Sequence, residues 1–224
     1  MAVLLTSRWY LIFMASAFLV VVTLGIRQSF GLFLLPATET MGTGREIFSL
    51  AMATQNLVWG LISPLAGAMA DKFGVARVAA IGAIFYSAGL LLMGIIVSPS
   101  GLFFGQIMVG IGLGSAGISI ALGAVARATK PENRSLALGL VTSIGSFGQF
   151  AILPITQSFI GGFGWQIALM LLSGVAASML AACLVLHLQD NEQAPQVAEI
   201  AKLSAKEALG TALKSRDYIL LTTG

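Results

Sequence analysis

Six long apolar stretches, separated by short polar, glycine or proline breaks, constrain this chain more than any other feature. They run approximately over Trp9–Leu35, Ile47–Ala70, Val78–Val97, Leu102–Ala126, Ser135–Ile160 and Trp165–Leu188. A helix needs about 20 apolar residues to cross a bilayer core of about 30 Å. The sequence therefore predicts an all-α membrane protein whose residues 1–188 form a bundle of six transmembrane helices.

The composition excludes an ordinary soluble domain. Of the 224 residues, 57% are hydrophobic and 9% are charged, whereas a soluble domain has about 45–50% apolar and about 25% charged residues. The first apolar stretch is longer than the apolar region of about 7–15 residues in a cleaved signal peptide, so we expect it to be retained.

The last 36 residues, Gln189–Gly224, carry nine of the charges. We expect residues 189–217 to form a cytoplasmic linker, in which Ser204–Glu207 has the pattern of a helix N-terminal capping box before a weakly amphipathic helix. A solvated helix and a regulatory element are both compatible with this pattern. Residues 218–224 are too few for a span, and we expect them to begin a seventh transmembrane helix.

The distribution of Lys and Arg predicts the orientation of the bundle, because basic residues concentrate in cytoplasmic loops. The loops on one side of the predicted bundle carry only Arg45. The loops and chain ends on the other side carry Arg8, Lys72, Arg77, Arg127, Lys130, Arg134, Lys202, Lys206, Lys214 and Arg216. We expect both termini in the cytoplasm and the chain in the bacterial inner (plasma) membrane.

Several classes of function are excluded by charge and by chemistry. The excess of 12 basic over 9 acidic residues is small and scattered, so nucleic acid is not an expected partner. The single cysteine, Cys183, allows no intramolecular disulfide and no Cys/His metal framework. No metal or cofactor is expected.

An intramembrane serine protease would need Ser115 and His187 to meet. Counted from the outer ends of their spans, the two residues differ in depth by about 12 Å, against about 3 Å for a nucleophile and its base. The sequence therefore predicts a protein that is not an enzyme.

Arg27 is the one clear charge inside the apolar zone. It could reach the outer interface or face a water-filled cavity, and an intramembrane charge is by default a functional candidate. Gln28 lies beside it, and Gln149 lies in the fifth span. One guanidinium with neutral donors suits a small anionic or polar solute, so we predict these three residues as the substrate-binding set. Gln55, Asn56, Gln106, Ser143 and Ser146 are further polar residues in the spans, and each could instead join helices.

Glycines are frequent in the fourth and fifth spans, including the Gly110-x-x-x-Gly114 spacing and Gly145 and Gly148. Such residues let helices approach closely in lipid. They fit simple bundle packing, and they also fit helices that rock against one another. Pro64 and Pro154 favour bends in their helices.

The loop Gly67–Arg77 resembles the signature loop between spans 2 and 3 of the major facilitator superfamily. It has the order glycine, three residues, aspartate, a basic residue, one residue and glycine, with Ala76 where a basic residue is common. In that family the aspartate lies near a helix N-terminus of the other half of the molecule and pairs with basic residues, which closes the cytoplasmic side. The predicted conformational gate therefore consists of Gly67, Asp71, Lys72, Gly74 and Arg77.

The fourth and fifth spans point to one branch of this family. Gln106–Gly114 is similar to the fourth-helix motif, with glutamine in place of a common arginine, and Gly139–Pro154 resembles the glycine-rich fifth helix of the monocarboxylate and oxalate/formate transporters. Gln28–Phe33 resembles the end of that branch's first helix, where some members place a lysine important for the anion.

The resemblance implies twelve helices in two halves, with the substrate site between the halves near the midplane. This chain corresponds to the first half, so we expect a truncated product or fragment that lacks a C-terminal half-domain and the partner of Asp71. The implied function is secondary transport of a small organic anion, such as a monocarboxylate, by alternating access across the bilayer. A half-length protein that homodimerises and a non-transporting scaffold are the alternatives, disfavoured by the unfinished seventh span and by the intact gate loop.

Overall fold

The computed structural model of this protein describes residues 7–187, with side chains from Trp9 onward, and its elements are helical. The elements are α1 (Ser7–Ser29), the 3-10 helix η1 (Phe30–Phe33), α2 (Leu34–Met41), α3 (Arg45–Phe73), α4 (Val75–Ile95), α5 (Pro99–Ala116), α6 (Ile118–Ala128), α7 (Pro131–Phe163) and α8 (Trp165–Ala177). After a break at Ser178 the helix continues over residues 179–187. The predicted linker and the start of a seventh span lie outside the described residues.

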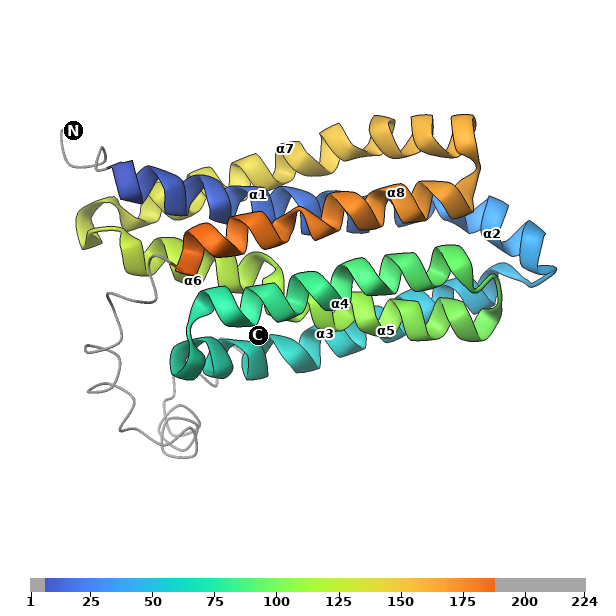
Figure 1. The fold of residues 1–224 in the computed structure, drawn as a ribbon, viewed down its shortest axis with the longest axis horizontal. Helices are drawn as coiled ribbons and strands as arrows, with labels where there is room; N and C mark the ends of the chain where they lie inside the picture. The colour runs from blue at the N-terminus through green and yellow to red at the C-terminus, as the bar shows by residue number, and fades with distance from the viewer. Residues whose placement is uncertain (1–6, 188–224) are drawn as a thin grey trace, which may run out of the picture. The chain divides into compact units, whose positions relative to one another are not determined.

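The helices run side by side along one direction, as Figure 1 shows. In that view α1, α7 and α8 lie above α3, α4 and α5. The closest pairs are α4 with α5, α1 with α7, α3 with α5, and α4 with α8. The helix α3 begins at one end of this bundle, here called the Arg45 end. It ends at the opposite end, where α4 begins, and this end is called the Asp71 end.

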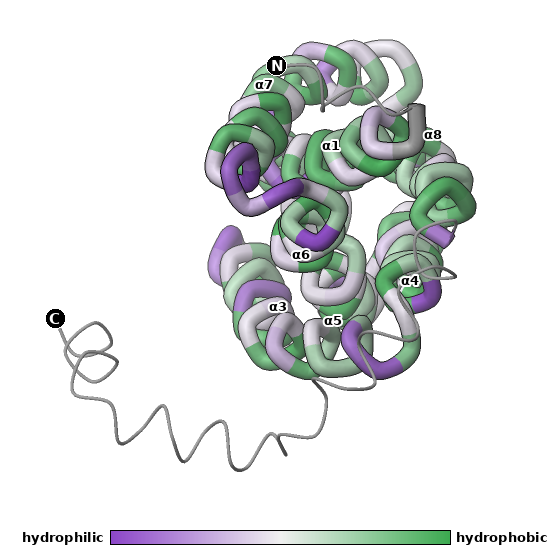
Figure 2. The backbone as a smooth tube through the Cα atoms, turned by 90° about the vertical axis from the view of Figure 1, so that its left-hand side faces the viewer, coloured by the Kyte–Doolittle hydropathy of each residue, from purple (hydrophilic) through white to green (hydrophobic). Residues whose placement is uncertain are grey.

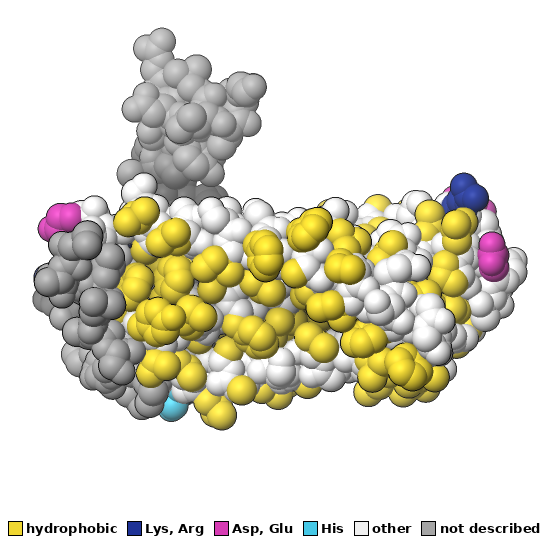
Figure 3. Space-filling view, turned by 90° about the horizontal axis from the view of Figure 1, so that it is seen from above, with side chains coloured by type: hydrophobic (Ala, Val, Ile, Leu, Met, Phe, Trp, Pro, Cys, Tyr) yellow, Lys and Arg dark blue, Asp and Glu magenta, His cyan; other side chains and the backbone are white. Residues whose placement is uncertain are grey.

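Seen end-on in Figure 2, hydrophilic residues gather mainly at the turns nearest the viewer. Figure 3 shows one face on which hydrophobic side chains cover the middle, with acidic or basic side chains at the extremities. Phe104 and Leu184 are examples of large apolar side chains that are exposed. A face of this kind suits contact with lipid, since soluble monomers do not expose such extended apolar surface.

Five helical segments are long and apolar enough to cross a membrane: Trp9–Met41, Val75–Ile95, Pro99–Ala128, Pro131–Phe163 and Trp165–His187. The helix α3 has 29 residues and is not among the five. Its centre carries Gln55 and Asn56 followed by Ser63 and Pro64, which lower its mean hydropathy. The prediction that α3 also spans the membrane stays a prediction.

The breaks between helices are built from the residues that punctuate the sequence. Gly74 and Gly164, with φ of 95° and 82°, end α3 and α7 in a backbone conformation that other residues rarely adopt. The Ser98 hydroxyl accepts a hydrogen bond from the Gly101 amide at 3.1 Å and caps α5, whose first residue is Pro99.

One break was not expected from the sequence. The fourth span divides at Gly117 into α5 and α6, and Gly117 itself has an extended backbone. By contrast, α3 and α7 each run through their internal proline, Pro64 and Pro154, as one continuous helix. Glycine weakens a helix, but Gly110, Gly112 and Gly114 stay helical within α5, so glycine alone does not account for the break at Gly117.

Glycines set the close helix contacts. A Cβ on Gly112 of α5 would lie 2.6 Å from the Tyr86 Cβ of α4, and one on Gly110 would lie 2.8 Å from the Gln55 carbonyl oxygen of α3. On α7, a Cβ at Gly148 would lie 2.7 Å from Val21 of α1. The packing role expected for the glycines of spans 4 and 5 is confirmed at these positions.

Each end of the bundle also has a tryptophan hydrogen bond. Trp9 Nε1 donates to Thr129 Oγ1 at 2.9 Å at the Asp71 end, and Trp165 Nε1 donates to Thr40 Oγ1 at 3.0 Å at the Arg45 end. These bonds join α1 to the residue after α6, and α8 to α2.

Candidate functional site at mid-bundle and gate at the Asp71 end

Arg27 lies near the middle of the first helical segment, because helix continues through η1 and α2 as far as Met41. The sequence left open whether its side chain reaches the outer interface or faces a water-filled cavity. The structure turns it sideways toward α3, where its Nη2 donates a hydrogen bond to Asn56 Oδ1 at 2.8 Å. Arg27 is therefore held by another helix at mid-length.

Trp59 forms the second contact of Arg27. The guanidinium carbon lies 5.0 Å from the centroid of the Trp59 ring, a cation–π distance. Asn56 and Trp59 are three residues apart on α3 and so lie on one side of that helix. Asn56 is exposed and Arg27 is half-buried, so this contact lies at the surface of the described helices.

The guanidinium keeps unused hydrogen-bonding capacity. Its Nε is buried and has no partner among residues 9–187. A guanidinium carries five N–H donors and binds a carboxylate in a two-pronged geometry. Arg27 can therefore stay hydrogen-bonded to Asn56 while donors other than the buried Nε bind an anion.

The other two predicted substrate-binding residues are separate from this contact. Gln28 follows Arg27 on α1 and is exposed, and Gln149 is half-buried on α7. No hydrogen bond joins either side chain to Arg27 within the described part of the chain. Gln28 neighbours Arg27 along the chain, and Gln149 lies on α7, which packs on α1 where Gly148 approaches Val21.

Asp71 is exposed near the end of α3, and its carboxylate pairs with Arg127 of α6 at 3.0 Å. The sequence analysis expected the partner of Asp71 to be missing from this chain. The structure gives Asp71 a partner within this chain, because α6 brings Arg127 to the end of α3, and the partner expected from the other half stays a prediction. The sequence did not single out Arg127 as a partner of Asp71, because 56 positions separate the two residues.

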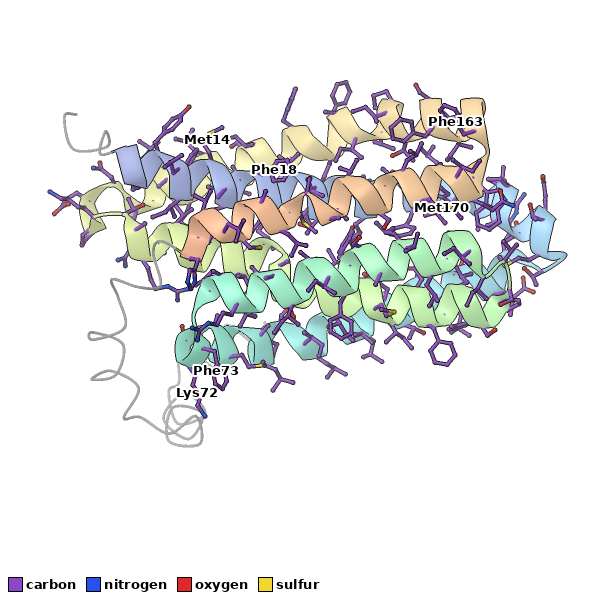
Figure 4. The ribbon with its side chains drawn as sticks, in the orientation of Figure 1. Met14, Phe18, Lys72, Phe73, Phe163 and Met170 are labelled. Carbon is purple, nitrogen blue, oxygen red and sulfur yellow. The ribbon has the colours of Figure 1, made fainter. Side chains whose placement is uncertain are left out.

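Three other residues of the predicted gate lie around the same turn, and the fourth, Gly67, lies within α3. Gly74 makes the turn through its positive φ of 95°, and Arg77 Nη1 donates to the Phe73 carbonyl at 3.4 Å. The Lys72 ammonium lies 5.1 Å from the Phe73 ring centroid, and Figure 4 shows both side chains at the end of α3. Gly67 is half-buried within α3, and a Cβ there would meet nothing within 4 Å.

The described residues include no group of three or more His, Cys, Asp or Glu side chains that could hold a metal ion. The chemistry available at mid-bundle is therefore that of one guanidinium, amides and aromatic rings.

Comparison with known proteins identifies the family. The sequence pattern of the Major Facilitator Superfamily matches residues 4–223. The chain belongs to the major facilitator superfamily. It is thus an integral membrane protein of a family of transporters, and not one of enzymes.

Three curated relatives show the range of this family. The chain is 27% identical over 182 residues to the uncharacterized MFS-type transporter YcxA of Bacillus subtilis (strain 168). The matched region covers 80% of this chain and 43% of YcxA. It is 30% identical over 126 residues to the putative niacin/nicotinamide transporter NiaP of the same organism, covering 56% and 30% of the two chains. It is 27% identical over 151 residues to sugar transport protein 11 of Arabidopsis thaliana, covering 66% and 29%.

The matched regions span less than half of the length of each of these relatives. Their names cover different substrates, so they support transport as a class of function without a substrate.

Proposed function

We propose that residues 1–188 form the N-terminal six-helix bundle of a secondary transporter that moves a small organic anion, such as a monocarboxylate, by alternating access. The observation that carries this proposal is the Arg27 guanidinium, held at mid-length between Asn56 and Trp59 of α3. A charge at this depth is costly, and membrane proteins retain such charges mainly for function.

The environment of Arg27 supports an anion rather than a cation as the substrate. Asn56 and Trp59 fix the guanidinium without neutralising it, and no acidic side chain forms an ion pair with it among the described residues. A carboxylate that reaches Arg27 from the surface would satisfy the free donors and balance the charge. Gln28 and Gln149 would then serve as neutral donors around the substrate.

The test is uptake of radiolabelled lactate and acetate by cells that express the protein. We expect Arg27→Ala to lower uptake about tenfold or more, since hydrogen bonds to a charged group contribute about 1.5–3 kcal/mol. Arg27→Lys keeps the charge but loses the two-pronged geometry, so we expect an intermediate value. Arg45→Ala, at the Arg45 end, is the matched control.

All three variants should reach the membrane in the same amount as the wild type. Unchanged uptake by Arg27→Ala at an equal membrane level would contradict the assignment of Arg27 to the anion.

The second element of the proposal is a conformational gate made of Gly67, Asp71, Lys72, Gly74 and Arg77. The ion pair between Asp71 and Arg127 supports it, because it joins two helices at one end of the bundle. An exposed pair of this kind can form and break at low cost, as a gate requires.

A further inference from the structure

Two glutamine amides are enclosed between α3 and α5. The side chains of Gln55 and Gln106 are both 0% exposed. Gln106 Nε2 donates to the Met52 sulfur at 3.4 Å, and its Oε1 has no partner within residues 9–187. Neither Nε2 nor Oε1 of Gln55 has a partner there.

The two amides share one seam between the helices. Met52 and Gln55 are three residues apart on α3, and Gln106 and Gly110 are four apart on α5, so each pair lies on one face of its helix. Gln106 contacts Met52, and Gly110 packs on the Gln55 backbone. The side chains of Gln55 and Gln106 therefore lie within one helical turn of each other along this seam.

The unpaired atoms between α3 and α5 define the hydrogen-bonding groups that a ligand at this place would need. They comprise an amide N–H₂ donor and two amide oxygen acceptors. A buried polar group without a hydrogen bond costs free energy, and buried water molecules typically make about three hydrogen bonds to such groups. A cation would lack a carboxylate to balance it, because the described residues include no acidic cluster that could hold one.

We infer that Gln55 and Gln106 bind a structural water molecule between α3 and α5. The water accepts a hydrogen bond from Gln55 Nε2 and donates to Gln55 or Gln106 Oε1. This site is independent of the proposed anion site. It nevertheless adjoins that site along the chain, since Asn56, the residue after Gln55, accepts the hydrogen bond of Arg27.

The experiment is X-ray hydroxyl-radical footprinting of the protein in lipid nanodiscs, with oxidation of each methionine measured by mass spectrometry. Radicals form from water, so a methionine beside a bound water is oxidised even in an apolar surrounding. Met52 is the reporter, and the buried Met93 and Met179 are the internal references. We expect Met52 to be oxidised several-fold faster than either reference.

Two further measurements separate bound water from bulk water. A radical scavenger dissolved in the bulk solvent should leave most of the Met52 oxidation unchanged, because radicals from a bound water form next to Met52 and do not pass through the solvent. Gln55→Leu and Gln106→Leu should each reduce Met52 oxidation toward the rate of Met179. Gln157→Leu, at an exposed glutamine of α7, should leave it unchanged.

Three results would overturn the inference. Met52 oxidation as slow as that of Met179 would mean that the seam is dry or that the two amides bond directly. Loss of Met52 oxidation with the scavenger, or full oxidation in both leucine variants, would mean that bulk water reaches Met52 from the surface of the helices. The scavenger experiment uses the wild type alone, so it decides the matter even where a variant fails to fold.

Discussion

At the scale of single residues, Arg27 is the centre of the candidate site, and Trp59 is the neighbour that the sequence did not single out. The ring lies 5.0 Å from the guanidinium carbon and covers one face of the cation. Asn56 fixes one edge. Together these contacts restrict the rotamers of a long side chain, so that the proposed anion would meet a guanidinium already in position.

We predict that Trp59→Leu weakens anion binding. A cation–π contact at a partly buried site is worth about 1 kcal/mol, which corresponds to a rise of roughly fivefold in KM. Uptake measured over a range of lactate concentrations checks this, with Phe104→Leu, at an exposed aromatic residue of α5, as the control. A KM equal to that of the control variant would show that Trp59 does not position Arg27.

At the scale of helices, glycine contacts fix how closely the elements pack. Gly112 of α5 faces α4, where an added Cβ would lie 2.6 Å from the Tyr86 Cβ and 2.8 Å from the Gly82 carbonyl oxygen. Gly139 of α7 is exposed, and an added Cβ there would meet nothing within 4 Å. The same substitution at the two positions therefore has opposite consequences.

We predict that Gly112→Ala destabilises the bundle by about 1–3 kcal/mol, because two backbones must move apart. Gly139→Ala should be neutral or stabilise by about 0.5–1 kcal/mol, since alanine favours helix over glycine. Thermal unfolding of the purified protein in detergent, followed by tryptophan fluorescence, measures both. Equal midpoints for the two variants would contradict the close packing of α4 on α5.

At the scale of the whole molecule, alternating access requires the proposed substrate site to open first at one end of the bundle and then at the other. The Asp71–Arg127 pair joins α3 to α6 at one end only. Its side chains are 64% and 31% exposed, so it contributes about 0–1 kcal/mol to stability. Such a pair can bias a conformational equilibrium while leaving the fold intact.

We predict that Asp71→Asn and Arg127→Gln shift the balance between the two access states, whereas the thermal midpoint changes little. Reporter cysteines at Gly31 and Gly139, both exposed and with space around them, measure this by their labelling rates in membranes. The buried Cys183 should react little. The exchanged pair Asp71→Arg with Arg127→Asp should restore the wild-type ratio.

An unchanged ratio of the two labelling rates in Asp71→Asn would remove Asp71 from the gate. A large fall in the thermal midpoint would instead assign the pair a structural role.

The sequence by itself determined the class of the protein, the approximate ends of the helical segments, and the turn at Gly74 with its Asp71 loop. These features are local, since the hydropathy of about 20 neighbouring residues and the conformation of one glycine depend on nearby sequence. The match of the family pattern to residues 4–223 supports the same conclusion. The assignment of Arg27, Gln28 and Gln149 as one substrate-binding set stays a prediction.

The tertiary structure alone decided which side chains meet. Arg27 with Asn56 and Trp59, Asp71 with Arg127, and Gln106 with Met52 are contacts between different helices. Each depends on the rotation and depth of two helices, which hydropathy does not encode because it averages over all faces of a helix. The glycine contacts of α4 with α5 and of α3 with α5 set that rotation, and they exist only once the helices have packed.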